Sequence, residues 1–368
     1  MTADVAVVGA GVIGLAAAWR CAQRGMRVTV HDPHPGSGAS SVAAGMLAPV
    51  SEAYFGEPEL TALMVASAGQ WPDFAEELSG YGDVGYRTDG TLVVALTADD
   101  LAAAARVWRY QASLGLPVEE LAAAAMREAE PVLHPRVRRG ARVDDHQADP
   151  RRLVAVLRGA AEDAGVRMEP RPVGSLADVE AGTVVVAAGT ATARLTGLPV
   201  RPVKGQLLRL RAPEGGPGFR YVIRGYADGR RVYLVPRPGG EVVVGASEEE
   251  RTDDLPTAGA VLELLRAATD LVPELTEYEL AEVCVGHRPG TPDNAPIVGR
   301  WRDRTVVASG HYRHGILLAP VTADAVAELV ATGRVPQVIA PFGPDRFATG
   351  PGRSAAPNGS TAAGEEET

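Results

Sequence analysis

Residues 4–32 read DVAVVGAGVIGLAAAWRCAQRGMRVTVHD, and the fold is decided in this stretch. Residues 4–8 form a short Val-rich run, which is typical of a strand buried on both faces. The apolar, Ala-rich residues 12–23 predict a helix, and residues 27–31 predict a second strand. Gly25 lies between the two, where the end of a helix favours a residue that can adopt positive φ. The pattern therefore predicts a strand–helix–strand unit.

Three glycines in the first turn of this unit have the spacing of a dinucleotide-binding motif. Gly9, Gly11 and Gly14 follow the pattern G-x-G-x-x-G. The first makes a tight turn, the second lets the backbone approach a pyrophosphate, and the third lets helix and strand pack closely. The helix N-terminus attracts phosphates, and Asp32 can accept hydrogen bonds from ribose hydroxyls. We expect a bound dinucleotide, either FAD or NAD; the alternative is a unit with a structural role alone.

The composition restricts the class of protein and its partners. The chain has 368 residues, is 46% hydrophobic and carries a formal net charge of −10, which suits a soluble protein of two domains without a nucleic-acid partner. It contains no apolar run of about 18 residues, so we expect no membrane partner. The first strand lies close to the initial Met, and only Cys21 and Cys284 are present, so we expect a cytoplasmic protein without disulfides.

The remainder of the chain predicts a mixture of helices and strands. Small residues over 33–41 precede a short helix predicted at 42–49, which Ser40 or Ser41 could cap. Further helices are predicted at 57–78, 99–114, 150–163, 257–271 and 316–331. Strands are predicted at 86–96, 183–188, 207–210, 221–224, 231–236, 241–246, 283–286 and 305–309.

The order of these elements predicts a discontinuous first domain. The buried strand over 183–188 should rejoin the sheet that begins at residue 4, whereas the strands over 207–246 form an antiparallel run. We therefore expect an α/β domain of Rossmann type and an α+β substrate domain on a mainly antiparallel sheet. The predicted nucleotide domain comprises 1–55, 145–205 and 285–336, the substrate domain comprises 56–144 and 206–284, and 345–368 form a disordered tail.

Three separated segments carry a resemblance to a known family. They are VAVVGAGVIG with VTVHD at 5–32, SSVAAGMLAP at 40–49, and GHRPGTPDNAPIVG with ASGHYRHGILLAP at 286–320. They resemble the FAD-dependent amine and amino-acid oxidases, which include D-amino acid oxidase, sarcosine oxidase and glycine oxidase. YLVPR at 233–237 followed by VVVGAS at 242–247 is most similar to the glycine oxidases of the thiamine pathway.

The resemblance implies an activity and a set of partners. It implies that FAD accepts a hydride from Cα of glycine or another small amine, that an imine forms, and that oxygen reoxidises the flavin to give hydrogen peroxide. It also implies homo-oligomers, which occur in this family. The cofactor would lie along Gly9, Gly11, Val12, Ile13, Gly14, Asp32, Pro33, Ala39, Ser40, Ala44, Gly45, Met46, Val173, Gly310, His311, Tyr312, Arg313, His314, Gly315, Ile316 and Leu317.

Three residues are predicted to bind the substrate. Arg288 could hold a carboxylate through two parallel hydrogen bonds, and we place it at the end of an apolar strand. From position alone an ordinary ion-paired arginine is the better interpretation; the resemblance favours the substrate anchor. Tyr233 matches a tyrosine that adds a second carboxylate contact, or else it is a core residue of a strand. Arg313 matches a residue near the substrate amine. Glu248 departs from one branch of glycine oxidases and is left out of the predicted site.

Other interpretations remain open. His287, His311 and His314 could suggest a metal, but no acidic or cysteine partner completes a ligand set nearby in the sequence, so none is predicted. The substrate could instead be sarcosine, a D-amino acid or another secondary amine such as proline. The enzyme could also be a dehydrogenase that passes electrons to an acceptor other than oxygen. A nucleotide-binding protein without catalytic activity is the rival from another class.

Overall fold

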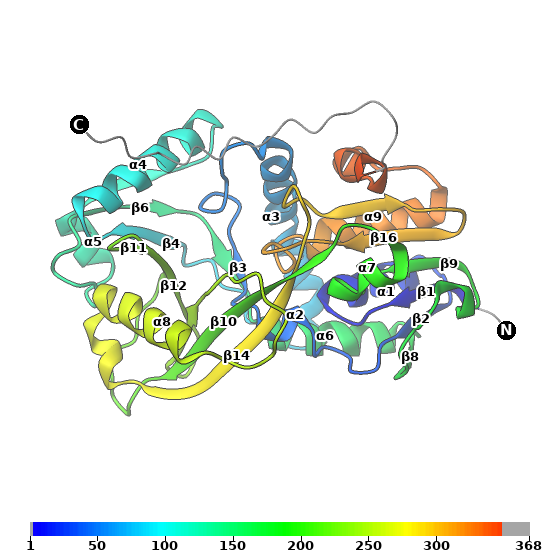
Figure 1. The fold of residues 1–368 in the computed structure, drawn as a ribbon, viewed down its shortest axis with the longest axis horizontal. Coiled ribbons are helices and arrows are strands. Elements are labelled where there is room, and N and C mark those ends of the chain that lie inside the picture. Colours follow the sequence, from blue (N-terminus) through cyan, green and yellow to red (C-terminus); the bar gives the residue numbers. More distant parts are fainter. Residues whose placement is uncertain (1–2, 348–368) are drawn as a thin grey trace, which may run out of the picture.

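The computed structural model describes residues 3–347, which form two sheets with helices packed around them (Figure 1). The first sheet has six strands, and all its neighbouring strands are parallel except the outermost pair, β15 and β16. In spatial order the strands are β15 (Ile297–Arg300), β16 (Thr305–Ser309), β9 (Ala181–Val186), β1 (Ala3–Val8), β2 (Val28–His31) and β8 (Arg167–Glu169). Segments from both ends of the described chain therefore meet in one sheet.

Helices cover one face of this sheet and bury its largest core. The core contains Trp19, Trp71 and Phe74, all almost completely buried. The helices are α1 (Val12–Gln23), α3 (Pro58–Ser79), α6 (Pro150–Asp163) and α9 (Ala319–Thr332). The opposite face packs against residues around η1 (Leu176–Asp178), η2 (Gly189–Ala191) and α7 (Thr192–Thr196). Both faces are covered, which explains why the strands are continuous apolar runs.

The second sheet has eight strands and is antiparallel except where β11 pairs with β4. Its order is β14 (Glu279–Gly290), β10 (Arg201–Arg211), β13 (Glu241–Gly245), β12 (Arg230–Pro236), β11 (Val222–Ala227), β4 (Thr91–Ala95), β6 (Arg139–Val143) and β5 (Glu119–Ala122). Helix α8 (Ala258–Leu271) packs on one face, and α4 (Ala98–Ser113) packs on the other; α5 (Ala123–Ala129) and η3 (Pro273–Glu277) lie beside them. The predicted combination of a Rossmann-type sheet with a mainly antiparallel sheet is confirmed.

The longest strand pair joins the two halves. β10 and β14 stay paired from Arg201 opposite Gly290 to Arg211 opposite Glu279, and they run diagonally from one half toward the other (Figure 1). The domain boundaries that we propose at 205/206 and 284/285 fall inside this pair. The division into domains stays a proposal, in which these two strands belong to both halves.

Some elements differ from the predictions. No helix covers 42–49: a short α2 (Ala39–Val42) precedes β3 (Met46–Leu47), which pairs with β7 (His146–Gln147). Ser40 caps no following helix; its Oγ accepts a hydrogen bond from the Val12 N–H of α1, at 3.1 Å. Tertiary strand pairing explains the first error, because residues 42–49 have no partner visible in their own sequence.

Three further differences concern the second half of the chain. The last long helix begins at Ala319 instead of residue 316, after a series of turns. Arg288 lies within β14, which continues to Gly290, and does not end the strand. Residues 345–347 belong to η5 (Pro344–Phe347), which follows η4 (Gln337–Phe342), so they are not part of a disordered tail; residues 348–368 lie outside the described range.

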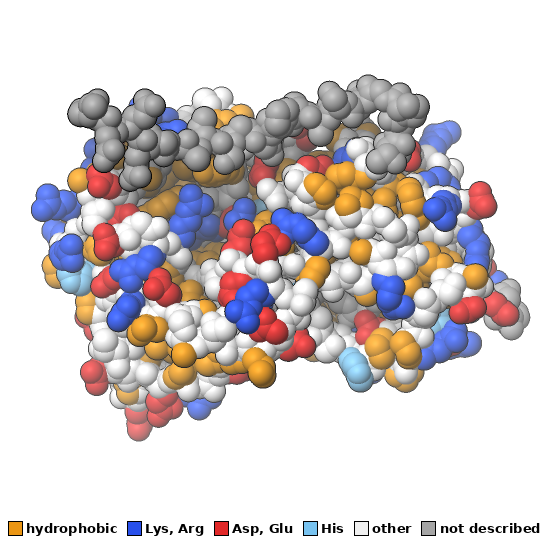
Figure 2. Space-filling model, viewed as in Figure 1, with side chains coloured by type: hydrophobic (Ala, Val, Ile, Leu, Met, Phe, Trp, Pro, Cys, Tyr) orange, Lys and Arg blue, Asp and Glu red, His pale blue; other side chains and the backbone are white. Residues whose placement is uncertain are grey.

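Basic and acidic side chains are interspersed over the face shown in Figure 2. Within residues 3–347, no helix is both long enough and apolar enough to cross a membrane.

Candidate active site

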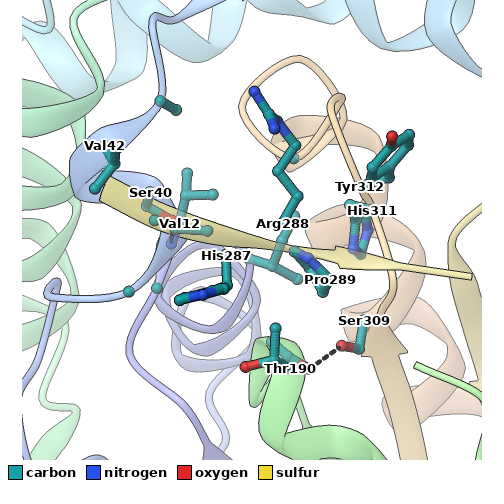
Figure 3. A pocket seen from close by; sticks show the side chains of 18 of the residues that line it. Val12, Ser40, Val42, Thr190, His287, Arg288, Pro289, Ser309, His311 and Tyr312 are labelled. Atoms are coloured by element: carbon teal, nitrogen blue, oxygen red, sulfur yellow. Dashed lines mark hydrogen bonds between the residues drawn. The ribbon is translucent and has the colours of Figure 1, made fainter. Parts of the chain in front are cut away.

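A cavity of about 430 Å³ lies between the two sheets. Its walls come from the turn between β1 and α1, from α2, from η2, from β10 and β14, and from the turns over 308–316. Figure 3 shows Val12 and Ser40 at one side of β14, with Arg288, His311 and Tyr312 around the strand. Segments distant in the sequence thus form one site.

The glycine motif forms a backbone cradle at one end of the cavity. Gly9 has φ +108°, and a Cβ there would collide with the carbonyl oxygen of Ala187. A Cβ on Gly14 would collide with the carbonyl oxygen of Gly9, so this glycine serves close packing. Gly11 is different, because a Cβ there would meet only Ser40 Oγ, at 3.3 Å. The space beside Gly11 belongs to the cavity, which leaves the backbone open to a ligand.

Asp32 is fixed at the end of β2, where it lines the same cavity. Its Oδ2 accepts a hydrogen bond from the Ala10 N–H at 2.7 Å, and its Oδ1 accepts one from the His34 N–H at 2.8 Å. These contacts hold the carboxylate beside the glycine turn, and each oxygen keeps acceptor capacity for a hydroxyl. The donors of the helix N-terminus and this acceptor fit the phosphates and ribose of a dinucleotide.

The predicted cofactor residues divide into two groups. Most of them line the cavity: Gly9, Gly11, Val12, Ile13, Asp32, Pro33, Ala39, Ser40, Ala44, Gly45, Met46, Val173, His311, Tyr312, Arg313, His314, Gly315 and Ile316. Gly14, Gly310 and Leu317 are not in its walls. Leu317 instead accepts hydrogen bonds at its carbonyl from Ser67 and Trp71 of α3. Contact between each of these residues and the cofactor stays a prediction.

His287 carries a buried polar atom at the wall of this cavity, without a partner in the described part of the chain. The side chain of His287 lines the cavity wall beside Thr190 (Figure 3). Its Nδ1 lies 3.6 Å from Asp254 Oδ1, while its Nε2 is buried and has no hydrogen-bond partner among residues 3–347. A buried polar atom without a partner is costly. The cradle and Asp32 together fit a bound FAD.

Arg288 and Tyr233 lie together at the other end. Arg288 Nη1 donates a hydrogen bond to the Ser247 carbonyl at 3.1 Å, and its guanidinium covers Gly205, where a Cβ would collide with it. Tyr233 covers Gly245 in the same way. Burial raises the pKa of Tyr233, although the neighbouring Arg288 opposes this shift. The tyrosine therefore stays a neutral hydrogen-bond donor beside a permanent cation.

A buried ion pair in this cavity is absent from the predicted site. Glu52 lines the cavity, and its Oε1 lies 2.5 Å from Arg224 Nη1. Burial favours a raised pKa for Glu52, but Arg224 and the other cations around it outweigh burial and lower the pKa to about 2. Local sequence offers no pattern for this pair. One feature of the sequence could have indicated Glu52: its carboxylate follows shortly after the run of small residues over 39–48, which is itself predicted to line the cofactor site.

Arg313 lies at the edge of this ion pair. Its Nε is 3.8 Å from Glu52 Oε2, and its Nη1 is 3.7 Å from Glu248 Oε2. Both distances are too long for hydrogen bonds, and the guanidinium donates no hydrogen bond to any of residues 3–347. The N–H groups of Arg313 can therefore still donate to a ligand, although Glu52 and Glu248 offset its charge.

The two histidines of the predicted site are uncharged. Burial lowers the pKa of His311 to about 3 and that of His314 to about 4. His311 Nε2 lies 3.1 Å from Thr322 Oγ1 of α9, which fixes the ring. Among the described residues, no group of three or more His, Cys, Asp and Glu side chains could hold a metal ion.

Comparison with known proteins shows the family. The family model described as "FAD dependent oxidoreductase" matches residues 4–329. A glycine oxidase from Geobacillus kaustophilus is 36% identical over 372 residues, which cover 92% of this chain and 96% of the relative. A crystal structure of glycine oxidase from the same species superposes with a TM-score of 0.87 at 34% identity, covering 94% of this chain and 99% of that one.

Two further relatives carry names connected with thiamine. A putative thiamine biosynthesis oxidoreductase ThiO from Rhizobium etli is 36% identical over 339 residues, covering 89% of this chain and 96% of the relative. The bifunctional protein ThiO/ThiG of Synechocystis is 35% identical over 376 residues, which cover 95% of this chain but 54% of the relative. This chain thus spans about half the length of the bifunctional relative.

These findings decide between the cofactors that the glycine motif left open, and FAD is the one supported. They also exclude the interpretation of the strand–helix–strand unit as purely structural. By its sequence and its fold, the chain belongs to the family of FAD-dependent oxidoreductases.

Proposed function

We propose that this enzyme oxidises glycine. Glycine loses a hydride from Cα and a proton from nitrogen, which leaves an imine; water then converts the imine to glyoxylate and ammonia. Oxygen takes up the two electrons and two protons and becomes hydrogen peroxide. Bound FAD supplies the hydride acceptor for this chemistry. One observation carries the proposal, namely that Arg288 and Tyr233 share a cavity with the dinucleotide cradle around Gly11.

Arg288 and Tyr233 would bind the substrate carboxylate. A guanidinium matches a carboxylate with two parallel hydrogen bonds, and the Tyr233 hydroxyl can donate a third. The contact of Arg288 with the Ser247 carbonyl and the close cover over Gly205 leave its guanidinium little freedom. A substrate held in one orientation presents the same Cα–H bond to the acceptor each time, and such positioning supplies much of the rate in this kind of reaction.

The turns over 311–317 would surround the reacting end of the cofactor. They carry backbone N–H groups, and they precede the N-terminus of α9, where the helix dipole favours negative charge. His311 and His314 are neutral, so the backbone N–H groups and the helix dipole supply this stabilisation. The segment therefore suits the charge that develops during hydride transfer.

The physiological role that we propose is the supply of the glycine imine to thiazole synthesis for thiamine. The names of the Rhizobium and Synechocystis relatives support this role. The proposal includes oxygen as the electron acceptor and a cytoplasmic location.

The first experiment is a visible spectrum of the purified holoenzyme before and after anaerobic glycine. Loss of the flavin bands with glycine, followed by one equivalent of peroxide per glyoxylate in air, is the expected result. Sarcosine, D-alanine and D-proline should bleach the flavin more slowly. A flavin that glycine leaves oxidised while one of these amines bleaches it would overturn the choice of substrate. A normal turnover without peroxide would overturn the choice of acceptor.

The Arg288 anchor has its own test. Arg288→Ala should keep FAD but weaken the apparent affinity for glycine by the equivalent of about 2–5 kcal/mol, because the substrate carboxylate loses its buried partner. The affinity of Arg288→Lys for glycine should lie between those of the wild type and Arg288→Ala. Lysine keeps the positive charge but cannot form the two parallel hydrogen bonds of a guanidinium. Arg211→Ala, at the exposed end of β10, is the matched control. An unchanged affinity for glycine in Arg288→Ala would show that the carboxylate binds elsewhere.

A further inference from the structure

The cavity holds two guanidinium groups that could meet an anion. Both Arg288 and Arg313 line it. The positive charges of both arginines favour a lower pKa for the hydroxyl of Tyr312. Burial and the carboxylate of Glu248 are stronger and raise that pKa to about 12. A substrate with two carboxylates would therefore find two cations in the walls of the same cavity. Glycine needs only one of them.

The two arginines differ in their negative neighbours. Arg288 donates to a neutral carbonyl and forms no ion pair with any residue in the described range. Arg313 lies between two carboxylates, Glu52 at 3.8 Å and Glu248 at 3.7 Å. Only Arg288 is thus free to give its full charge to a substrate carboxylate.

Burial separates the two carboxylates beside Arg313. The side chain of Glu248 is 54% exposed, so water screens its charge. The side chain of Glu52 is 13% exposed and lines the cavity, so its charge acts through protein instead of water. Glu52 also keeps that charge at any working pH, because its pKa is about 2.

We infer that Glu52 is a specificity residue that restricts the site to substrates with a single carboxylate, an inference that rests on the proposed function. Glu52 offsets the charge of Arg313 and repels a second anionic group that approaches it. Arg224 holds the Glu52 carboxylate in place from the opposite side, at 2.5 Å. The excluded class consists of dicarboxylates of suitable length, such as iminodiacetate, which is glycine with a carboxymethyl group on nitrogen.

The variant that tests this inference is Glu52→Gln, which removes the negative charge and keeps a side chain of the same size. Its amide oxygen can still accept a hydrogen bond from Arg224, so that Arg224 keeps a partner. It leaves the charge of Arg313 without its buried counter-ion. The double variant Glu52→Gln/Arg224→Gln removes one charge of each sign and is the control for net charge. Glu52→Asp, which keeps the negative charge, is the conservative variant.

The readout is binding of non-reacting anions to the oxidised holoenzyme. Acetate, malonate and succinate are titrated at about pH 8, where all are fully ionised, and perturbation of the flavin spectrum reports binding. In the wild type, malonate and succinate should bind no better than acetate. In Glu52→Gln the affinity for at least one dicarboxylate relative to acetate should rise by about tenfold or more. The double variant should stay close to the wild-type ratio, because its net charge is unchanged. Glu52→Asp should keep the wild-type ratio.

Glu248→Gln is the matched control, because it removes a carboxylate at the same distance from Arg313 but in solvent. We expect it to change the ratio by about twofold at most. A folded, FAD-loaded Glu52→Gln variant with the wild-type ratio would overturn the inference, and so would a rise of about tenfold in the double variant. An equal rise in Glu248→Gln would also overturn it, because burial would then not matter. Failure of acetate to bind the wild type would instead contradict the Arg288 anchor of the proposed function.

Discussion

Gly11 lines the cavity, and a side chain at this position would stand in it. Gly11→Val should abolish FAD binding, because two methyl groups would occupy the space next to the first turn of α1. The ratio of bound flavin to protein after purification measures the effect. Circular dichroism of the same sample should show a folded apoprotein.

A glycine with open space far from the cavity provides the control. Gly159 lies on the exposed face of α6, and a Cβ there would meet no atom within 4 Å. Gly159→Val should purify with the wild-type amount of flavin. A yellow Gly11→Val protein would contradict the placement of the cofactor beside this turn.

Single residues were predictable where a local pattern required them. Gly9, Gly11 and Asp32 follow from a motif whose members lie within one supersecondary unit, and the structure brings them to one cavity. Glu52 and Arg224 were not predictable, because their ion pair joins a loop to a distant strand. Nothing in the spacing of two residues so far apart in the chain indicates that they touch.

Among the helices, α6 begins at a cap formed by a single side chain, that of Asp149. Asp149 accepts hydrogen bonds from the N–H groups of Arg151 and Arg152, at 2.9 and 3.3 Å, and Pro150 occupies the first helical position. Asp149→Ala should lower the free energy of unfolding by about 1 kcal/mol, since the first turn loses its cap. Urea unfolding measures the change. Asp149→Asn should keep most of the wild-type free energy of unfolding, because asparagine can also cap the helix. Equal losses of this free energy in both variants would point to charge instead of capping.

The elements differ in how far their own sequence determines them. α1 has the predicted bounds, 12–23, because glycines flank it on both sides and its interior contains good helix formers. β3 was missed because it exists only through its pairing with β7, about a hundred residues later in the chain. The start of α9 was placed three residues early, since residues 316–318 have helical composition but lie in turns.

For the molecule as a whole, the buried histidines predict how stability depends on pH. His311 and His314 have pKa values of about 3 and 4 in the folded protein, below the usual value of about 6.5. The unfolded chain therefore binds more protons than the folded one below about pH 6.5, and stability falls as the pH falls. Glu52 adds a further loss below about pH 4.5, because its pKa is about 2 in the folded state.

The slope of this loss can be measured. Each imidazole should contribute about 1.4 kcal/mol per pH unit between about pH 6.5 and its folded pKa. Urea unfolding with saturating FAD, repeated from about pH 8 to pH 5, gives the slope. His311→Gln/His314→Gln should flatten it, whatever the absolute stability of the variant. An unchanged slope would mean that these imidazoles are already protonated in the folded protein.

The order of strands in the first sheet has a consequence for how the chain folds during its synthesis on the ribosome. β1 is made first, and it pairs with β9, which in turn pairs with β16 near the end of the described chain. The β9 edge of the cofactor sheet therefore stays unpaired until residues 305–309 emerge to supply β16, and the helix layer stays incomplete until α9 follows. Such a chain exposes apolar surface throughout its synthesis. Slow translation of its later segments should thus cause aggregation, and loss of them should cause both aggregation and loss of the cavity residues that they carry, such as His311 and Arg313.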